Sequence, residues 1–239
     1  MTLLVTGRGH AETRSGLCAA LLASTMLVAG TIPAAGQAVS EPTGRFEVSA
    51  GVSLLGGAAF GGQPANERTA SGATYRLFDS STELASSAGF EARVGVVVTR
   101  RITLEARAAL GQPELRTSVS GDVEGAPAIT SVERLDQYIF DGGMTFRVDE
   151  WRIFGLVPFA SAGAGYLRQL HEGQTLVDEG HLFYAGGGVT RGLFARGNGL
   201  VRGVGLRADI RMNVVSGGVS FDDDSRVQGA FSGSVFVAF

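Results

Sequence analysis

Apolar and polar residues alternate along much of the chain after residue 44. In FEVSAGVSL, residues Phe46, Val48, Val52 and Leu54 fall on one face of an extended chain, and Glu47 falls on the opposite face among small residues. An alternation of period two is typical of a β-strand whose two faces meet different surroundings. The same pattern recurs in FEARVGVVV, ITLEARAAL, YIFDGGMTFR and LRADIRMN. Two glycine-rich segments, IFGLVPFASAGAGY and HLFYAGGGVTRG, alternate less regularly.

With the last segment of the chain, the pattern predicts eight strands. Their expected ranges are 44–56, 87–100, 102–118, 130–147, 152–169, 180–194, 201–216 and 226–239. Short connections are expected at 100–101, at 148–151 and across RGNG at 196–199. Long polar or glycine-rich loops are expected at 57–86 and around SGDVEGAPA, HEGQTLVDEG and FDDDS. An even number of strands with alternately short and long connections fits an all-β fold: an eight-stranded antiparallel up-and-down transmembrane β-barrel.

The distribution of charge predicts which face lines the lumen. The polar faces collect charges of both signs at neighbouring heights, while the apolar faces are nearly uncharged over the middle of each strand. Alternation alone also permits a soluble barrel with an apolar interior. Strands of about ten residues, tilted by about 45°, match the thickness of a bilayer and favour the membrane-spanning form. The expected lumen network consists of Glu47, Glu91, Arg93, Glu105, Arg107, Asp141, Arg147, Arg207, Asp209 and Arg211.

Aromatic and glycine residues fit the same arrangement. Aromatic side chains near strand ends are typical of the girdles at membrane interfaces. The residues assigned to the short-turn end are Phe46, Phe90, Phe146, Trp151, Phe154, Phe194 and Phe239, and those assigned to the long-loop end are Tyr138 and Tyr166. Glycines on the inner face would make room for arginine side chains in a narrow lumen. These are Gly143, Gly163, Gly165, Gly186 and Gly188.

The first 38 residues have the layout of a secretory signal peptide. Arg8 and Arg14 precede an apolar run at 17–30, and a cleavage site follows Ala38, with Gly36 at position −3. We therefore expect a signal peptide at 1–38 and one barrel domain at 39–239. The only cysteine, Cys18, would leave with the signal, so neither a disulfide nor a cysteine nucleophile is expected in the mature chain. With a net charge of −3, the chain lacks the basic surface expected of a nucleic-acid-binding protein.

The last strand, VQGAFSGSVFVAF, places alternate apolar residues on one face and ends on an aromatic residue. Phe231, Val235, Val237 and Phe239 resemble the terminal signature of bacterial outer-membrane β-barrels, which the barrel-assembly machinery recognises. The chain, including the segment PFASAGAGY, resembles the small eight-stranded OmpA/OmpX-like barrels. The resemblance implies an outer-membrane location in the envelope of a Gram-negative bacterium, contact with outer-membrane lipid and lipopolysaccharide, and a monomer.

The resemblance is less specific for activity, because the family includes anchors, adhesins, small channels and a few lipid A enzymes. We expect a structural or surface-interaction role without enzymatic activity. A narrow, porin-like channel for small apolar solutes is the first alternative, and an apolar lumen near the outer mouth would favour it. A lipid A-modifying enzyme would need His171 or His181 to meet a serine across the loops. The run Asp222–Asp224 lacks the spacing of a calcium loop, so neither a metal nor a cofactor is expected.

Overall fold

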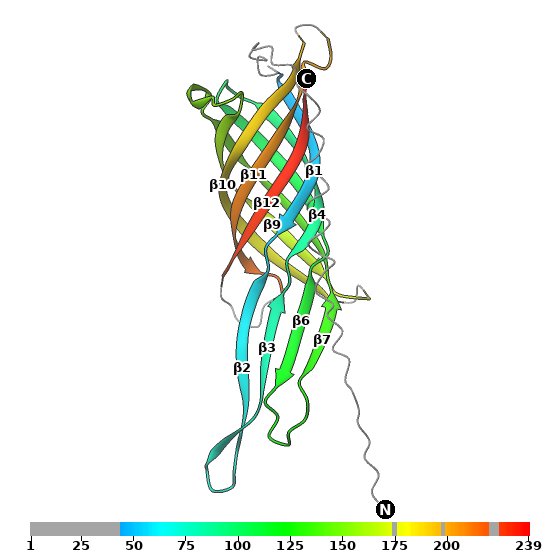
Figure 1. The fold of residues 1–239 in the computed structure, drawn as a ribbon, viewed down its shortest axis with the longest axis vertical. Helices are drawn as coiled ribbons and strands as arrows, with labels where there is room; N and C mark the ends of the chain where they lie inside the picture. Colours follow the sequence, from blue (N-terminus) through cyan, green and yellow to red (C-terminus); the bar gives the residue numbers. More distant parts are fainter. Residues whose placement is uncertain (1–43, 174–175, 197–198, 220–224) are drawn as a thin grey trace, which may run out of the picture. The chain divides into compact units, whose positions relative to one another are not determined.

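The fold is a closed barrel of eight antiparallel strands, seen in a computed structural model that describes residues 44–239 except 174–175, 197–198 and 220–224. The strands follow one another around the wall in the order β1-β12-β11-β10-β9-β8-β5-β4 (Figure 1). They are β1 (Phe46–Leu55), β4 (Ser87–Val97), β5 (Ile102–Gly111), β8 (Asp136–Arg147), β9 (Val157–Leu170), β10 (Val177–Ala195), β11 (Gly203–Gly217) and β12 (Arg226–Ala238). The predicted fold class is confirmed. The proposed signal peptide, the run Asp222–Asp224 and the middle of the RGNG connection, 197–198, lie outside the described residues.

The first and last strands of the wall close the barrel. β1 pairs with β12 from Glu47↔Ala238 to Leu55↔Ala230, and with β4 along its other edge. At the end of this seam the amide of Arg45 donates to the carbonyl of Phe239 at 2.7 Å, and the amide of Phe239 donates to the carbonyl of Phe46 at 2.8 Å. Every wall strand is thus paired on both sides, which a membrane-spanning sheet requires because lipid offers its backbone no hydrogen bonds.

The faces of the wall are oriented as the alternation predicts. In β1 the exposed positions are Phe46, Val48, Ala50, Val52 and Leu54, and the intervening side chains point inward. The same inversion, with apolar side chains outside and polar or charged ones inside, holds in β4, β8, β11 and β12. A soluble barrel would bury the apolar set. The burial pattern therefore excludes the soluble barrel with an apolar interior.

The predicted long loops contain a second sheet. Its strands are β2 (Ala58–Arg68), β3 (Thr74–Leu84), β6 (Glu114–Ser120) and β7 (Ile129–Arg134), in the order β2-β3-β6-β7. The segment 57–86, expected as one long loop, instead forms the hairpin β2–β3. Figure 1 shows the four strands extending from the end of the barrel opposite the carboxyl terminus. We call this end the loop end and the opposite one the turn end.

Two predicted strands are each divided in the structure. The range 102–118 separates into β5 and β6 around Pro113, which has no amide hydrogen to donate to a strand ladder. The range 130–147 separates into β7 and β8 at Leu135, which is fully buried. Leu135 packs with Leu84, Leu115 and Val219, and this cluster joins the second sheet to the mouth of the barrel.

The turn end differs from the prediction in two details. β9 begins at Val157 rather than at 152, because Phe154 and Gly155 both adopt positive φ angles, of 53° and 79°, and interrupt the strand. The 3₁₀ helix η1 (Asp149–Trp151) occupies part of this connection. Phe90, assigned above to the turn end, lies near the loop end of β4, since β4 begins there at Ser87. In the described ranges there is no helix long and apolar enough to cross a membrane.

Candidate functional site

The lumen collects the charged residues of the inward faces. All ten residues of the expected network lie inside the barrel, and no side chain among them is more than 11% exposed. Burying a charge is costly unless the charge is paired and hydrogen-bonded. The arrangement of partners therefore decides whether this lumen can be stable.

Six of the ten residues form a closed ring in which arginines and carboxylates alternate. Each arginine contacts two carboxylates and each carboxylate contacts two arginines, over N···O distances from 2.5 to 3.4 Å. None of the six side chains is more than 3% exposed. We call this set the charge ring. In order around the ring it consists of Glu91, Arg93, Asp209, Arg211, Asp141 and Arg107, which returns to Glu91.

Strand register places the ring at one level of the barrel. Arg93 on β4 is the register partner of Arg107 on β5, which is in turn the partner of Asp141 on β8. β11 supplies Asp209 and Arg211 from across the lumen. Arg93 also donates to the hydroxyl of Ser232 on β12 at 2.7 Å. Five strands are thus connected through the interior by side chains.

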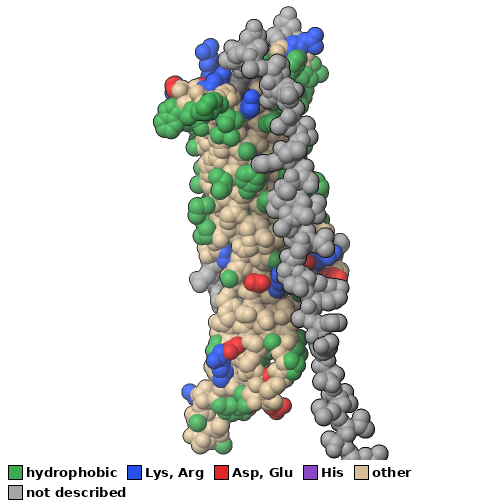
Figure 2. Space-filling view, in the orientation of Figure 1, with side chains coloured by type: hydrophobic (Ala, Val, Ile, Leu, Met, Phe, Trp, Pro, Cys, Tyr) green, Lys and Arg blue, Asp and Glu red, His purple; other side chains and the backbone are tan. Residues whose placement is uncertain are grey.

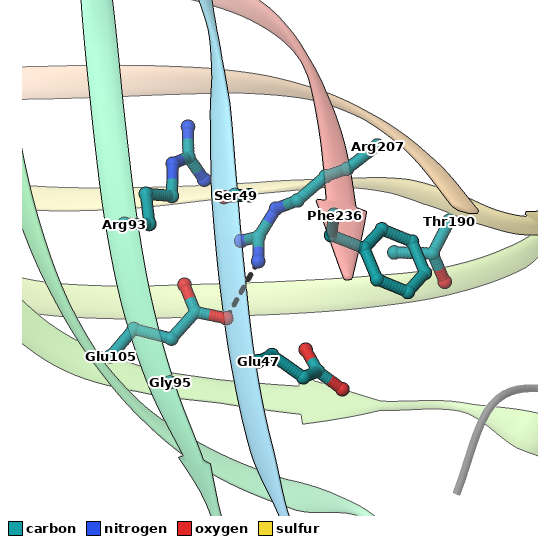
Figure 3. Close-up of a pocket in the computed structure, with 8 residues that line it drawn as sticks. All are labelled: Glu47, Ser49, Arg93, Gly95, Glu105, Thr190, Arg207 and Phe236. Carbon is teal, nitrogen blue, oxygen red and sulfur yellow. Dashed lines mark hydrogen bonds and ion pairs between the residues drawn. The ribbon is translucent and has the colours of Figure 1, made fainter. Parts of the chain in front are cut away.

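The remaining four charged residues extend the network toward the turn end. Arg207 contacts Asp209 of the ring at 3.2 Å and Glu105 at 2.6 Å, and Figure 3 shows the second contact as a dashed line. Arg147 contacts Glu47 at 2.5 Å. The planar guanidinium groups also stack on inward-facing aromatic rings. Arg207 lies 4.3 Å from the ring centre of Phe159, and Arg211 lies 4.5 Å from that of Tyr184.

Glycines on the inner face leave the space that these side chains occupy. A methyl group added at Gly186 would lie 3.0 Å from Cγ of Arg211, and one added at Gly188 would lie 2.8 Å from Cβ of Asp209. At Gly163 the neighbour is instead Tyr184, whose Cε1 atom is 2.7 Å from the added methyl position. The inner-face glycines therefore accommodate a tyrosine as well as the charged residues.

Very little space remains inside the network. A cavity of about 10 Å³ lies beside it, lined by Glu47, Arg93, Glu105, Arg207 and Phe236 among others (Figure 3). A volume of this size holds about one water molecule. The charged side chains therefore fill most of this section of the lumen.

Toward the loop end, apolar side chains fill the lumen. This cluster was not predicted from the sequence, although its members are the apolar exceptions on otherwise polar inner faces. All are less than 8% exposed. They are Leu55, Ala109, Ile139, Leu167, Leu182, Tyr184, Val215 and Ala230. An apolar lumen near the mouth is the condition named above for a channel, but here the side chains pack against one another.

His171 lies between two carboxylates just outside the barrel wall. Its Nδ1 is 2.7 Å from Glu133 on β7, and its Nε2 is 2.8 Å from Asp178 on β10. Burial opposes a charge on the ring, but the hydrogen bonds to Asp178 and Glu133 outweigh it and raise the pKa of His171 above 6.5. Both ring nitrogens are occupied, so neither is available to activate a serine. His181 packs edge-on against Tyr166, with ring centres 6.2 Å apart.

No group of three or more histidine, cysteine or acidic side chains in the described part of the chain is arranged to hold a metal ion. A paired and buried network such as the charge ring can stabilise and seal a lumen. It presents no nucleophile next to a free base.

Together, the apolar outer wall, the closed antiparallel sheet and the filled lumen define a small transmembrane β-barrel of eight antiparallel strands. No family model matches the chain. No curated protein matches it either.

Solved structures with a similar fold include the following two. One is Ail, the attachment invasion locus protein of Yersinia pestis, in complex with the heparin analogue sucrose octasulfate. Its sequence identity is 11% and its TM-score is 0.43, over 82% of this chain and 99% of Ail. The other is Neisserial surface protein A, at 15% identity and a TM-score of 0.41, over 81% of this chain and 97% of that protein. At these identities and TM-scores the two neighbours carry no information on what this chain binds or does.

Proposed function

We propose that this protein is a monomeric, non-enzymatic barrel of the outer membrane of a Gram-negative bacterium, with a structural or surface-interaction role. In this proposal the turn end faces the periplasm, and the second sheet projects outside the cell as the contact surface. Outer-membrane lipid and lipopolysaccharide surround the apolar wall. The observation that carries the proposal is the combination of a filled lumen with a sheet that extends beyond the wall.

The second sheet has the features of a contact surface. Its outer strands, β2 and β7, each pair on one side only, which leaves two rows of backbone groups open to a partner. Large apolar side chains are exposed on it, including Tyr75, Ile129 and Val132. Such exposed apolar groups, set among polar residues, are typical of interaction sites.

The orientation can be tested by labelling single cysteines on intact cells. Removal of a signal at 1–38 would leave a chain without cysteine, so introduced thiols would be unique. We expect Ser71→Cys, in the turn between β2 and β3, to react with a membrane-impermeant maleimide on whole cells. Arg100→Cys, in the turn between β4 and β5, should react only after the outer membrane is permeabilised. The reverse pattern would overturn the orientation.

The interaction role can be tested by removing part of the second sheet. In one variant a short glycine–serine turn replaces residues 61–81, which leaves all eight wall strands intact. Cells displaying this variant should attach less than wild-type cells to immobilised matrix proteins and polysaccharides, at equal surface abundance. A matched variant shortened at the turn end, around residues 199–201, should attach normally. Equal attachment by all three would contradict a contact role for the sheet.

The apolar cluster in the lumen supports a second candidate, a narrow channel for small apolar solutes. This function would require Leu55, Ile139 and Leu182 to separate and the charge ring to open, because both fill the lumen in the structure. Cells with and without the barrel should then take up an apolar fluorescent probe at different rates. Equal rates would eliminate this candidate.

We further propose that the last strand is the recognition element for the barrel-assembly machinery. Phe231, Val235, Val237 and Phe239 lie at alternate positions of the segment that closes the barrel against β1. Phe239→Ala keeps the backbone hydrogen bonds and removes only the aromatic ring. It should leave secretion intact and slow assembly into the membrane, as measured by cell fractionation, and assembly at the wild-type rate would contradict the proposal.

A further inference from the structure

The two ends of the barrel carry opposite charge. The turn end exposes seven arginines, which we call the arginine belt, and only two acidic side chains, Asp149 and Glu150, lie among them. At the loop end carboxylates outnumber arginines. Figure 2 shows blue side chains gathered at the upper end of the molecule among green apolar ones. The belt consists of Arg45, Arg100, Arg101, Arg152, Arg191, Arg196 and Arg202.

Most of the belt is not neutralised by the protein itself. Arg101 pairs with Glu150. Arg45, Arg100, Arg191 and Arg196 form no ion pair with any residue in the described part of the chain. Arginine side chains are well suited to phosphate groups, because the planar guanidinium offers several N–H donors in a fixed fork.

Large apolar side chains stand in the same turns as the arginines. Trp151 is 70% exposed, Leu200 is 81% exposed and Phe154 is 91% exposed. Phe154 has a φ of 53°, a left-handed conformation that is unusual for a bulky residue, and its ring points away from the protein. Water is a poor environment for such groups, whereas the headgroup region of a bilayer accommodates aromatic rings beside cationic side chains.

The belt also lies at the height of a membrane boundary. Arg45 directly precedes Phe46, the first exposed residue of the apolar wall on β1. Arg191 points outward near the end of β10, and its register partner on β11 is the exposed residue Leu206. Long side chains at this level can keep their stems on the apolar wall and place their guanidinium groups among lipid phosphates.

We propose that the arginine belt binds anionic phospholipids of the leaflet that surrounds the turn end. The grounds are the four arginines without an ion pair among the described residues, the exposed aromatic residues beside them, and the common height of both groups along the barrel. The ligand chemistry is a phosphodiester headgroup with a net negative charge, as in phosphatidylglycerol. An acidic protein could satisfy the arginines but would leave the apolar side chains in water. The proposal rests on the transmembrane fold and is independent of the surface-interaction role and of the orientation in the cell.

The chain contains its own probe for this site, because Trp151 is its only tryptophan and lies within the belt. The mature protein is reconstituted in phosphatidylcholine vesicles that contain increasing fractions of phosphatidylglycerol with brominated acyl chains. Quenching of Trp151 is compared with quenching by brominated phosphatidylcholine at the same fractions. Each quenching curve gives an association constant for the lipid at the site around Trp151. The constant for phosphatidylglycerol should exceed the constant for phosphatidylcholine by at least about threefold at low salt, and the ratio of the two should approach one in 1 M salt.

Matched variants test whether the preference for anionic lipid comes from the arginine belt. Replacing Arg45, Arg100, Arg191 and Arg196 by glutamine should bring the ratio to about one, and Arg100→Gln alone should lower it in part. The same exchange at four exposed loop-end arginines, Arg68, Arg76, Arg116 and Arg134, should leave it unchanged. A ratio of one in the wild type would overturn the proposal, as would a preference that survives the belt substitutions or is lost only in the loop-end control. The salt comparison needs no variant, so a variant that fails to insert does not prevent a decision.

Discussion

Arg211 shows how strongly a single residue depends on the charge ring. Its side chain is 2% exposed, contacts Asp209 and Asp141, and stacks on Tyr184. Arg211→Ala would leave a buried negative charge in excess inside the barrel. We expect it to lower the free energy of unfolding by about 3–5 kcal/mol, the usual cost of removing one partner from a buried ion pair. Urea titration of the protein in lipid vesicles measures this change.

A matched substitution separates burial from charge. Arg68 on β2 is also an arginine but is exposed to solvent. Arg68→Ala should change the free energy of unfolding by no more than about 0.5 kcal/mol. Similar losses for the two variants would mean that the ring contributes no more than an exposed charge does.

His171 makes one contact of the second sheet sensitive to pH. The raised pKa means that the protonated ring is held more tightly in the folded chain than in the unfolded one. The contribution of protonated His171 to the stability of the folded chain is therefore complete below about pH 6.5. It is lost as the pH rises through the raised pKa of His171. Arg134, Asp136 and Glu172 line the same groove as His171, whose ring nitrogens contact Glu133 and Asp178.

The expected result is faster hydrogen exchange of the β7 amides at pH 8.5 than at pH 6, after correction for the intrinsic exchange rate. The double substitution Glu133→Gln and Asp178→Asn removes both carboxylates and should abolish the difference. A pH dependence that persists in this variant would show that another group carries it.

At the scale of the element, the wall strands could be predicted and the second sheet could not. A wall strand separates lipid from the lumen, so its alternation is strong and appears directly in the sequence, as in β1 and β11. β2 and β7 are exposed along most of their length on both faces. A strand with similar surroundings on both sides has no reason to alternate, and the glycines and Pro64 of β2 resemble those of a loop.

The candidate site was predictable in its members but not in its connections. Charged residues on the inner faces could be selected because lipid does not tolerate charge in the middle of the wall. Which arginine meets which carboxylate depends on the stagger between strands and on contacts across the lumen, such as Arg93 with Asp209, which are 116 residues apart. The sequence pattern within one strand contains no information on that stagger.

Gly163 on β9 packs closely against β8 and against Tyr184, and this packing can be tested by a substitution within β9. At Gly163 an added methyl group would lie 2.7 Å from both Cα of Gly143 and Cε1 of Tyr184, so Gly163→Ala should destabilise the barrel by about 1–3 kcal/mol. Gly229 on β12 is the matched control, because a methyl group there meets no atom within 4 Å. Gly229→Ala should be neutral or stabilise the barrel by up to about 1 kcal/mol. Equal unfolding curves for the two variants in vesicles would contradict the close packing around Tyr184.

At the scale of the whole molecule, the described residues form a barrel whose lumen is filled by side chains and whose two ends differ. The charge ring and the apolar cluster fill successive levels of the lumen, and the cavity beside the ring has a volume of only about 10 Å³. The loop end carries a sheet with free edges, and the turn end carries exposed arginines and aromatic residues. These features are better suited to anchoring in the membrane and contact at the surface than to transport.

The ion conductance of the purified mature protein in a planar bilayer tests the filled lumen most directly. An eight-stranded barrel leaves an interior just wide enough for side chains, and here charged residues and apolar residues occupy it. The structure predicts no sustained conductance across the range of voltages that the bilayer withstands, both for the wild type and for the exposed-site variant Arg68→Ala. A steady conductance of the wild-type protein would contradict the filled lumen and would favour the channel over the structural and surface-interaction role.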